Sequence, residues 1–459
     1  MVLQRGLALL VAGAFFMEIL DGTVIAPAAP HLAADLGVAP VDVNVAITAY
    51  VLTLGVLIPV SGWLADRFGA RRVFCTALAV FVLASAACAL APTLTALTAA
   101  RVAQGAGGAM MVPVGRLVVL RTTAKTDLVR AIAYLTWPAL LAPVLAPVVG
   151  GVLAEYASWR WIFVINVPLG LAALAVALRI VPGLRADTPP PLDRAGFALT
   201  AVGVAALIAG LEGLGSGFSP ATAAALVVAA GGLALAVRHL LRARHPLVDL
   251  RILRVATYRV TAASGSVYRA VITAIPFLLP LLFQVGFGWS AARAGAVVIA
   301  LFVGNVAIKP ATTPLMRRFG IRTVLLGSIA VGAACLVAMA FLQPTTPLPL
   351  LLALLLVSGT ARSIGFTAYN SVAFADVDAP RMTHANTLLS TLQELGAGLG
   401  VAVGALLVRL GQAVGGVPAA AGAAGPYRVA FVLLAVLLAL PAVTALRLAR
   451  TAGDAVTGH

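Results

Sequence analysis

Fourteen stretches of this sequence are apolar over the length that a helix needs to cross a lipid bilayer, which is about 20 residues. Only 10% of the chain is charged, whereas a soluble domain has about 25% charged residues. Because a backbone in lipid must satisfy its own hydrogen bonds, each stretch is predicted to be a helix. The predicted membrane spans cover residues 6–30, 45–65, 73–91, 95–119, 131–153, 161–181, 196–212, 221–240, 260–283, 294–313, 323–342, 347–371, 385–408 and 427–447.

The basic residues of the loops indicate how the spans are oriented. Alternate loops are basic and the loops between them carry few basic residues, so the positive-inside rule places both termini in the cytoplasm. This pattern predicts a multi-pass protein of a bacterial-type plasma (inner) membrane. The net charge of +16 resides mainly in these short loops and therefore does not indicate a nucleic-acid partner. The basic loops contain Arg67, Arg71, Arg72, Arg121, Lys125, Arg185, Arg194, Arg242, Arg244, Arg251, Arg254, Arg317, Arg318, Arg322 and Arg381.

The sequence contains an internal repeat. LADRFGARRV (Leu64–Val73) follows the second span and LMRRFGIRTV (Leu315–Val324) follows the tenth, with six of ten positions identical at an offset of 251 residues. Six spans with their loops need only about 200 residues, so the offset leaves room for two additional helices. The predicted domains are a six-helix bundle over residues 1–185, two extra spans within 186–245, and a second six-helix bundle over 246–459. The same offset maps Glu18 onto Arg269.

Four motifs resemble signatures of the major facilitator superfamily. GWLADRFGARR (Gly62–Arg72) is similar to its loop signature, and RVAQGAGGAMMVP (Arg101–Pro113) resembles its fourth-helix motif. LDGTVIAPAAP (Leu20–Pro30) resembles the first-helix motif of the fourteen-helix drug:proton antiporter branch. APVVGG (Ala146–Gly151) resembles the fifth-helix antiporter motif.

The resemblance implies an all-α integral membrane protein with the major facilitator fold. Two six-helix bundles and two extra central helices would make fourteen transmembrane helices, and the bundles would rock around a central site. It implies a proton-coupled exporter (a substrate:H⁺ antiporter) of small amphipathic molecules, of the multidrug efflux type. Ala142 and Ala146 stand where the antiporter motif usually has glycines, so import by proton symport stays open.

The first span carries two acids, Glu18 and Asp21. They are three residues apart and are predicted to lie on one side of a helix, and acids in lipid usually face a cavity or a partner. Arg101, on the fourth span, is predicted at the depth of Asp21, roughly 9 Å from the outer face. Because burial raises a carboxyl pKa and a neighbouring arginine lowers it, a switchable Asp21–Arg101 pair could couple protons to transport. Glu18 is a second candidate, tuned by or paired with Arg269.

The central cavity is predicted to contain further polar residues of the apolar spans. Arg116 and Lys309 either face this cavity or extend to the cytoplasmic interface, and Arg362 is a candidate partner of Glu394. Because the buried bases slightly outnumber the buried acids, export of an anionic or zwitterionic metabolite stays open as an alternative to drug efflux. The cavity candidates are Arg116, Trp137, Tyr268, Arg269, Gln284, Asn305, Lys309, Arg362, Asn370 and Glu394.

Two segments are predicted to control conformational change. In the loop signature, Asp66 is expected to pair with a neighbouring helix end, while Arg67 and Arg71 contact lipid or a carboxylate; the second copy has Arg317 in place of the acid. The prolines of span five would bend it, which suits a helix between two moving bundles. The gating candidates are Gly62, Asp66, Arg67, Gly69, Arg71, Pro147, Gly150 and Gly151.

Other classes of function lack their motifs in this sequence. Neither of the two lysines ends a glycine-rich phosphate loop, and neither HExxH nor GxSxG occurs. We therefore expect no enzyme activity, no nucleotide, no metal and no cofactor, with the proton gradient as the energy source. The expected partners are a small-molecule substrate, protons and the lipid bilayer, and a periplasmic accessory protein is left open.

Overall fold

The computed structural model describes residues 5–216, 219–415, 424–449 and 451–453, and over these residues the chain is helical with short connections and contains no strand. The first half and the two helices that follow it are α1 (Arg5–Leu36), α2 (Asn44–Phe68), α3 (Ala70–Ala89), α4 (Leu94–Thr122), α5 (Leu128–Tyr156), α6 (Trp161–Val164), α7 (Asn166–Ile180), α8 (Arg194–Ser216) and α9 (Pro220–Arg242). Short 3₁₀ turns, η1 (Pro40–Val43) and η2 (Lys125–Asp127), precede α2 and α5.

The second half follows a 3₁₀ turn, η3 (Leu250–Arg254). Its first span is interrupted by two π-helical segments, η4 (Thr261–Gly265) and η5 (Leu282–Gly286). Another 3₁₀ turn, η6 (Ala379–Arg381), precedes α16. The helices are α10 (Ala256–Val260), α11 (Ser266–Leu281), α12 (Ala291–Ala307), α13 (Lys309–Phe319), α14 (Ile321–Ala340), α15 (Leu348–Ala375), α16 (Met382–Gly415), α17 (Gly425–Leu437) and α18 (Ala439–Leu446).

The helices occupy the fourteen predicted positions. Counted over the described residues, twelve helical segments are long and apolar enough to cross a membrane, and α12 with α13 makes a further span that is bent by 50°. The remaining position is that of α5, whose 29 residues exceed the roughly 20 that a span needs. The side chains of residues 137–140, 143–144 and 147–148, in the middle of α5, lie outside the described part.

The span predicted over 294–313 differs from the structure. The helix breaks after Ala307, and α13 starts at Lys309 and continues to Phe319. Pro310 has no N–H to donate to the preceding turn, and its ring disfavours a continuous helix at this point. The apolar pattern runs through the break, which is why it predicted one straight span.

The internal repeat predicted from the loop signature is present in the structure. The two ends of α3, Ala70 and Ala89, correspond at an offset of 251 residues to the two ends of α14, Ile321 and Ala340. The turn before each helix contains a glycine with positive φ, 91° at Gly69 and 76° at Gly320. A left-handed backbone is a conformation that glycine adopts without steric cost, so the shared glycine is required by the shared turn.

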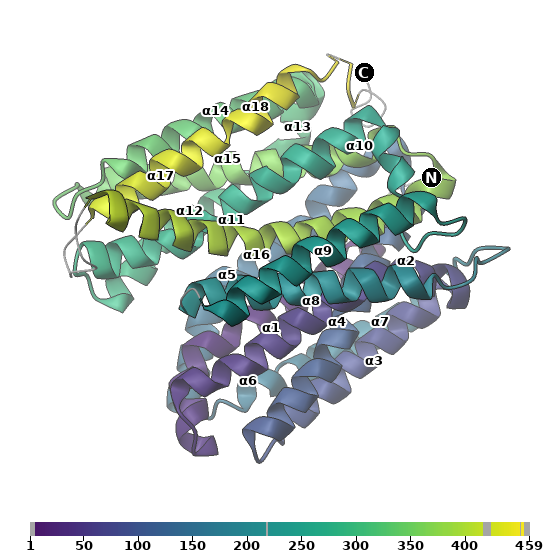
Figure 1. Cartoon of the computed structure of the whole chain (residues 1–459), viewed down its shortest axis with the longest axis horizontal. Helices are drawn as coiled ribbons and strands as arrows, with labels where there is room; N and C mark the ends of the chain where they lie inside the picture. Colours follow the sequence, from purple (N-terminus) through teal and green to yellow (C-terminus); the bar gives the residue numbers. More distant parts are fainter. Residues whose placement is uncertain (1–4, 217–218, 416–423, 450, 454–459) are drawn as a thin grey trace.

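The helices pack as two bundles with a hairpin across them (Figure 1). α1, α2, α3, α4, α5 and α7 contact one another, and α10 to α18 form a second set of packed helices. The predicted domain boundaries, after 185 and 245, fall in the segments between α7 and α8 and between α9 and η3. The hairpin of α8 and α9 packs against α2 of the first bundle and α16 of the second. Both chain termini lie at one end of the molecule (Figure 1), which we call the terminus side.

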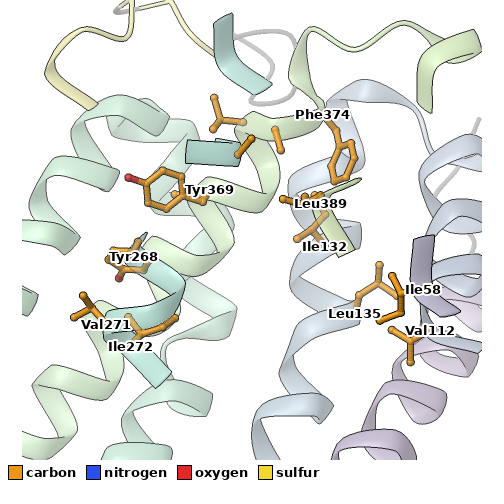
Figure 2. Packing of buried hydrophobic residues seen from close by; sticks show 14 of the residues in the cluster. Ile58, Val112, Ile132, Leu135, Tyr268, Val271, Ile272, Tyr369, Phe374 and Leu389 are labelled. Atoms are coloured by element: carbon orange, nitrogen blue, oxygen red, sulfur yellow. The ribbon is translucent and has the colours of Figure 1, made fainter. Parts of the chain in front are cut away.

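The two bundles meet along two lines of helix contact. α16 packs against α2 and α4, and α5 packs against α12, α13 and α15. Figure 2 shows buried apolar side chains along this boundary, with Ile58, Val112 and Leu135 on one side, Tyr268 and Ile272 on the other, and Ile132, Phe374 and Leu389 between them. The predicted contact of α5 with both halves is therefore present in the structure.

Candidate functional site

A cavity of about 380 Å³ lies between the two bundles. α1, α2, α4 and α5 line it from the first bundle, and α11, α12, α15 and α16 line it from the second. Such a volume falls within the range of small-molecule sites, roughly 300–1,000 Å³. Its polar lining includes Glu18, Thr23, Tyr50, Arg116, Thr136, Arg269, Thr273, Asn305, Arg362, Ser363, Asn370, Ser390, Gln393 and Glu394.

Apolar side chains make up much of the remaining wall. Ile58 on α2, Val112 on α4 and Leu135 on α5 are buried and line the cavity from the first bundle. Ile272 on α11 and Phe374 near the end of α15 line it from the second bundle, and all five appear in Figure 2. A wall of this kind suits a substrate with an apolar body, while the charged groups orient its polar end.

Two arginines of the second bundle reach the cavity and lie against aromatic rings. The Arg269 guanidinium is 5.0 Å from the centre of the Phe366 ring, and that of Arg362 is 5.7 Å from the centre of the Phe302 ring. Arg362 also donates a hydrogen bond to the Ile272 carbonyl at 3.0 Å. An arginine over an aromatic face is stabilised by the ring's negative potential, so these cations are held without a carboxylate.

Neither glutamate of the cavity forms an ion pair among the described residues. Glu18 on α1 and Glu394 on α16 both line the cavity, but no guanidinium lies within 4.0 Å of either carboxylate. The predicted Arg362–Glu394 pair is therefore not formed, because Arg362 turns to the Ile272 carbonyl instead. Glu18 and its repeat counterpart Arg269 line the same cavity without contacting each other as an ion pair.

Arg116 is part of the cavity wall rather than the membrane interface. Its side chain is 6% exposed, so it does not extend to the cytoplasmic interface. Nε donates to the Asn386 side chain at 2.6 Å and Nη1 to the Gln393 side chain at 2.9 Å, both on α16. A residue of the first bundle thus bonds to the second bundle in the wall of the cavity.

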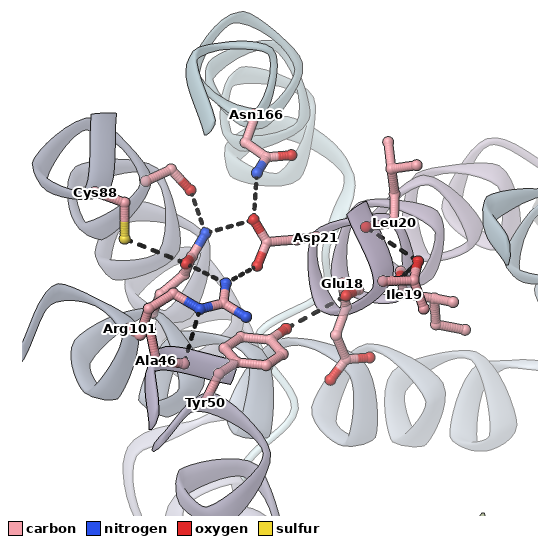
Figure 3. A network of polar contacts seen from close by, with 12 residues as sticks. Glu18, Ile19, Leu20, Asp21, Ala46, Tyr50, Cys88, Arg101 and Asn166 are labelled. Atoms are coloured by element: carbon pink, nitrogen blue, oxygen red, sulfur yellow. Dashed lines mark hydrogen bonds and ion pairs between the residues drawn. The ribbon is translucent and has the colours of Figure 1, made fainter. Parts of the chain in front are cut away.

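Asp21 lies beside the cavity, in a polar network inside the first bundle (Figure 3). It forms a fully buried ion pair with Arg101 of α4. Oδ1 accepts hydrogen bonds from the Gln104 amide at 2.8 Å and from the Asn166 amide of α7 at 2.7 Å. The Arg101 guanidinium lies 3.9 Å from the centre of the Tyr50 ring. Buried charges are tolerated only when paired and hydrogen-bonded, and this network meets that requirement for Asp21.

Glu18 and Asp21 were predicted to share one side of α1, but their surroundings differ. Three residues along a helix rotate a side chain by about 60° from full register. That rotation places Glu18 on the cavity and Asp21 between α1, α4 and α7. Figure 3 shows the Glu18 carboxylate directed away from the Asp21 network, with the Tyr50 hydroxyl bonded to the Glu18 backbone carbonyl.

Several residues of these networks were not among the predicted site residues. Gln104 follows Arg101 by one helical turn, and its position on the same face was a usable signal. Asn166, Asn386 and Gln393 are amides near or within apolar spans, where a polar side chain usually has a partner. Glu212 on α8 was also overlooked, and it accepts a hydrogen bond from Thr48 of α2.

The other cavity candidates fall into three groups. Asn305 and Asn370 line the cavity, whereas Tyr268 is buried behind it and donates to the Ala361 carbonyl at 3.3 Å. Lys309 is buried next to the cavity, bonded to two threonines. Gln284 is exposed in the second π-helical segment and does not line the cavity, since it lies near the end of its span. The Trp137 side chain lies outside the described residues.

The loop signature joins the bundles on the terminus side. Asp66 at the end of α2 accepts hydrogen bonds from Arg121 of α4 at 3.1 Å and from Thr383 of α16 at 3.3 Å. Gly62, one turn earlier, is buried where α2 crosses α16: a Cβ there would lie 2.3 Å from the Thr387 hydroxyl. The acid therefore contacts both a helix of its own bundle and a helix of the other.

The remaining gating candidates have other surroundings. Arg71 donates to the Leu178 backbone carbonyl, not to a carboxylate, because the end of α7 lies beside the start of α3. Arg67 is exposed. On α5, a Cβ at Gly150 would lie 2.6 Å from the Val24 carbonyl of α1, whereas one at Gly151 would have nothing within 4 Å. The Pro147 side chain lies outside the described residues.

Sequence comparisons match this architecture over most of the chain. The profile of the Major Facilitator Superfamily matches residues 11–401. A protein of Salmonella dublin named "Putative multidrug resistance protein MdtD" is 37% identical over 442 residues, 95% of this chain and 93% of that protein. A protein of the same name from Cronobacter sakazakii is 39% identical over 405 residues, 87% of this chain and 85% of that protein.

Solved structures of low sequence identity share the fold. The human organic anion transporter MFSD10 (TETRAN) superposes with a TM-score of 0.69 at 15% identity, over 97% of this chain and 100% of that chain. The proton:xylose symporter XylE, bound to 6-bromo-6-deoxy-D-glucose, superposes with a TM-score of 0.66 at 13% identity, over 98% of this chain and 96% of that chain.

Two bundles of membrane-spanning helices around a shared charged cavity define a multi-pass membrane transporter for small molecules. The chain belongs to the Major Facilitator Superfamily.

Proposed function

We propose that the protein is a proton-coupled exporter, a substrate:H⁺ antiporter, of small amphipathic molecules, and that it serves multidrug efflux from a bacterial cytoplasm. The observation that carries the proposal is the fully buried Asp21–Arg101 pair beside the cavity. The names of the two bacterial relatives, both multidrug resistance proteins, support the substrate class. Both termini are assigned to the cytoplasm on the distribution of basic loops.

The Asp21 network supplies a carboxylate whose charge depends on helix position. Paired with Arg101 and bonded to Gln104 and Asn166, the carboxylate is stabilised as an anion. A shift of α4 against α1 that separates the two charges would leave an unpaired acid in an apolar site, which favours proton uptake. A change of one unit in the pKa of the carboxyl group is equivalent to about 1.4 kcal/mol, which is what one unit of pH gradient supplies.

The contacts between the bundles support a cavity that is sealed from the terminus side. Asp66 with Thr383, Arg116 with Asn386, and Lys309 with Thr136 all join the bundles there. With the termini in the cytoplasm, this conformation is closed to the cytoplasm. In an alternating cycle it corresponds to the stage at which a substrate would leave outward and protons would enter.

The Asp21→Asn variant tests proton coupling. In everted vesicles with an acidic interior, we expect substrates of the wild type to dissipate the pH gradient, as reported by a pH-sensitive dye, and the variant to give no response, because an amide binds no proton. The matched control is Asp35→Asn, since Asp35 lies at the C-terminal end of the same helix, is 47% exposed and bonds to Arg160 at 2.5 Å. Unchanged transport by Asp21→Asn, at normal expression and gel-filtration profile, contradicts the assignment.

A second candidate function is export of an anionic or zwitterionic metabolite. Its specific support is the charge of the cavity, where Arg116, Arg269 and Arg362 face Glu18 and Glu394 without ion pairs among the described residues. The same vesicles decide between the candidates when lipophilic cations and organic anions are compared. A response to cations alone supports drug efflux, a response to anions alone supports the metabolite, and a substrate that acts only from the vesicle interior indicates symport.

A further inference from the structure

Lys309 is a buried lysine that joins the two bundles without a carboxylate. It is the first residue of α13, directly after the 50° bend from α12, and it is 7% exposed. Nζ donates to the Thr136 hydroxyl of α5 at 2.9 Å and to the Thr367 hydroxyl of α15 at 2.7 Å. The first threonine belongs to one bundle and the second to the other. The amine therefore bridges the boundary that must open in a transport cycle.

The two threonines can only accept hydrogen bonds from this nitrogen. The Thr136 hydroxyl donates its own proton to the Ile132 carbonyl at 2.9 Å, and the Thr367 hydroxyl donates to the Ser363 carbonyl at 2.9 Å. A neutral amine has two N–H groups, which the two hydroxyls satisfy. An ammonium has three, and no third acceptor from the described residues bonds to it. The bonding pattern therefore matches the neutral amine.

The surroundings of Lys309 also favour the neutral amine over the ammonium. No Asp or Glu lies within 4.0 Å of Nζ among the described residues. The acids of the packed helices are at their ends: Glu155 is exposed on α5, and Asp376, at the end of α15, accepts a hydrogen bond from Thr257. An isolated buried ammonium is costly. The other titratable groups on α13 and the helices packed against it are Arg130, Tyr134, Tyr156, Arg293, Arg317, Arg318, Arg322, Cys335, Arg362 and Tyr369.

We propose that Lys309 is a proton-operated latch: the neutral amine joins α5 to α13 and α15 when the terminus side is closed, and protonation of the amine favours separation of the bundles there. The proton comes from solvent on the terminus side, forms the third N–H bond of the ammonium, and returns to the same solvent when the bundles close. The inference rests on the proposed movement of the bundles. It predicts that the terminus side opens more readily when the pH on that side is low.

The test measures the separation of the bundles directly. Spin labels at Arg72→Cys and Thr323→Cys, exposed repeat-equivalent positions at the starts of α3 and α14, report the distance by electron double resonance. The background carries Cys75→Ala, Cys88→Ser and Cys335→Ala. Between pH 9 and pH 6 we expect a longer distance to gain population, with the open-to-closed ratio rising by up to about tenfold per pH unit for one linked proton.

Two substitutions at the same position are expected to shift the ratio in opposite directions. Lys309→Met cannot be protonated, so the part of the pH slope due to this residue should be lost and the variant should be more closed than the wild type at pH 6. Lys309→Arg stays charged over this range and should be open at both pH values. Other titratable groups contribute equally to the pH slope of all variants. The difference in slope between a variant and the wild type is therefore due to Lys309. A purely structural role predicts that both substitutions weaken closure and leave the slope unchanged.

The distance between the spin labels is measured without a substrate and without a pH gradient. A wild-type slope retained in Lys309→Met, or a closed Lys309→Arg, overturns the latch. If Lys309→Met fails gel filtration, Lys309→Gln takes its place as a neutral side chain that can still donate two hydrogen bonds, and we expect it to be closed and to lack the part of the pH slope due to Lys309. Failure of vesicle transport with an intact slope would refute the proposed antiport and leave the latch standing.

Discussion

Asp193, just before α8, contacts both helices of the hairpin and the linker that follows it. Its carboxylate accepts hydrogen bonds from the Gly196 N–H at 2.8 Å, the Leu247 N–H at 3.2 Å and the His239 ring at 2.8 Å. Burial alone would raise the pKa of Asp193, but the hydrogen bonds from Gly196, His239 and Leu247 outweigh burial and hold the pKa below its usual value. The anion therefore ties the start of α8 to the end of α9 and to the linker that leads to the second bundle.

Replacing Asp193 should loosen this end of the hairpin. Asp193→Ala removes a helix cap, which costs about 1 kcal/mol, and should lower the thermal midpoint measured by fluorescence-detected gel filtration. Asp193→Asn is the matched control, because asparagine caps a helix nearly as well as aspartate. A carboxylate with a lowered pKa stabilises the fold above its ordinary pKa of about 3.9. The wild-type advantage should therefore persist from pH 9 to pH 5 and be lost only below about pH 4. An equal midpoint for wild type and Asp193→Ala would contradict the role.

At the scale of the elements, α1 and α5 approach closely because α5 has a glycine where they cross. A Cβ at Gly150 would lie 2.6 Å from the Val24 backbone oxygen, and a backbone atom cannot rotate away as a side chain can. Small residues allow such close helix approach in lipid. Gly151, the next residue, has nothing within 4 Å of its own Cβ position.

The neighbouring glycines give a matched pair of substitutions. Gly150→Ala should destabilise the first bundle by roughly 1–3 kcal/mol, the cost of overpacking a tight contact, and lower the thermal midpoint in detergent. Gly151→Ala meets nothing and should leave the midpoint unchanged or slightly raised, since alanine favours helix over glycine. Equal midpoints for the two variants would mean that α1 and α5 are not in contact at Gly150.

At the scale of the whole molecule, the two bundles are held together where α2 crosses α16. A Cβ at Gly62 would lie 3.5 Å from the Thr387 Cβ, a separation at the short end of the range for disulfides, about 3.5–4.5 Å. The same crossing lies one helical turn from the Asp66–Thr383 hydrogen bond. A covalent link at this point would therefore hold the molecule in the conformation described here.

The Gly62→Cys/Thr387→Cys pair should form such a link. In the background without native cysteines, we expect oxidation to abolish vesicle transport and a reductant to restore at least half of it, because the bundles can then separate again. Gly62→Cys alone is the control for the effect of the new side chain. Full transport by the oxidised pair, with the disulfide confirmed by mass spectrometry, would show that this crossing does not open during the cycle.

Much of the architecture could be read from the sequence. The apolar stretches predicted the positions of the spans, because a helix satisfies its backbone hydrogen bonds within its own segment when it is surrounded by lipid. The repeat of the loop signature predicted equivalent turns, which the structure places at Gly69 and Gly320. Equal depth on antiparallel spans predicted that Asp21 and Arg101 could meet, and they do.

Tertiary packing decided which polar groups face the cavity. Hydrophobic patterning gives the depth of a residue but not the rotation of its helix when the whole helix is apolar. The sequence therefore could not predict which of Glu18 and Asp21 faces the cavity. For the same reason Arg362 could not be matched to the Ile272 carbonyl, nor Lys309 to two threonines from opposite bundles. The sequence by itself determined a bundle of membrane helices in two related halves. Only the packing of those halves determined which charges are paired, which line the cavity and which join the bundles.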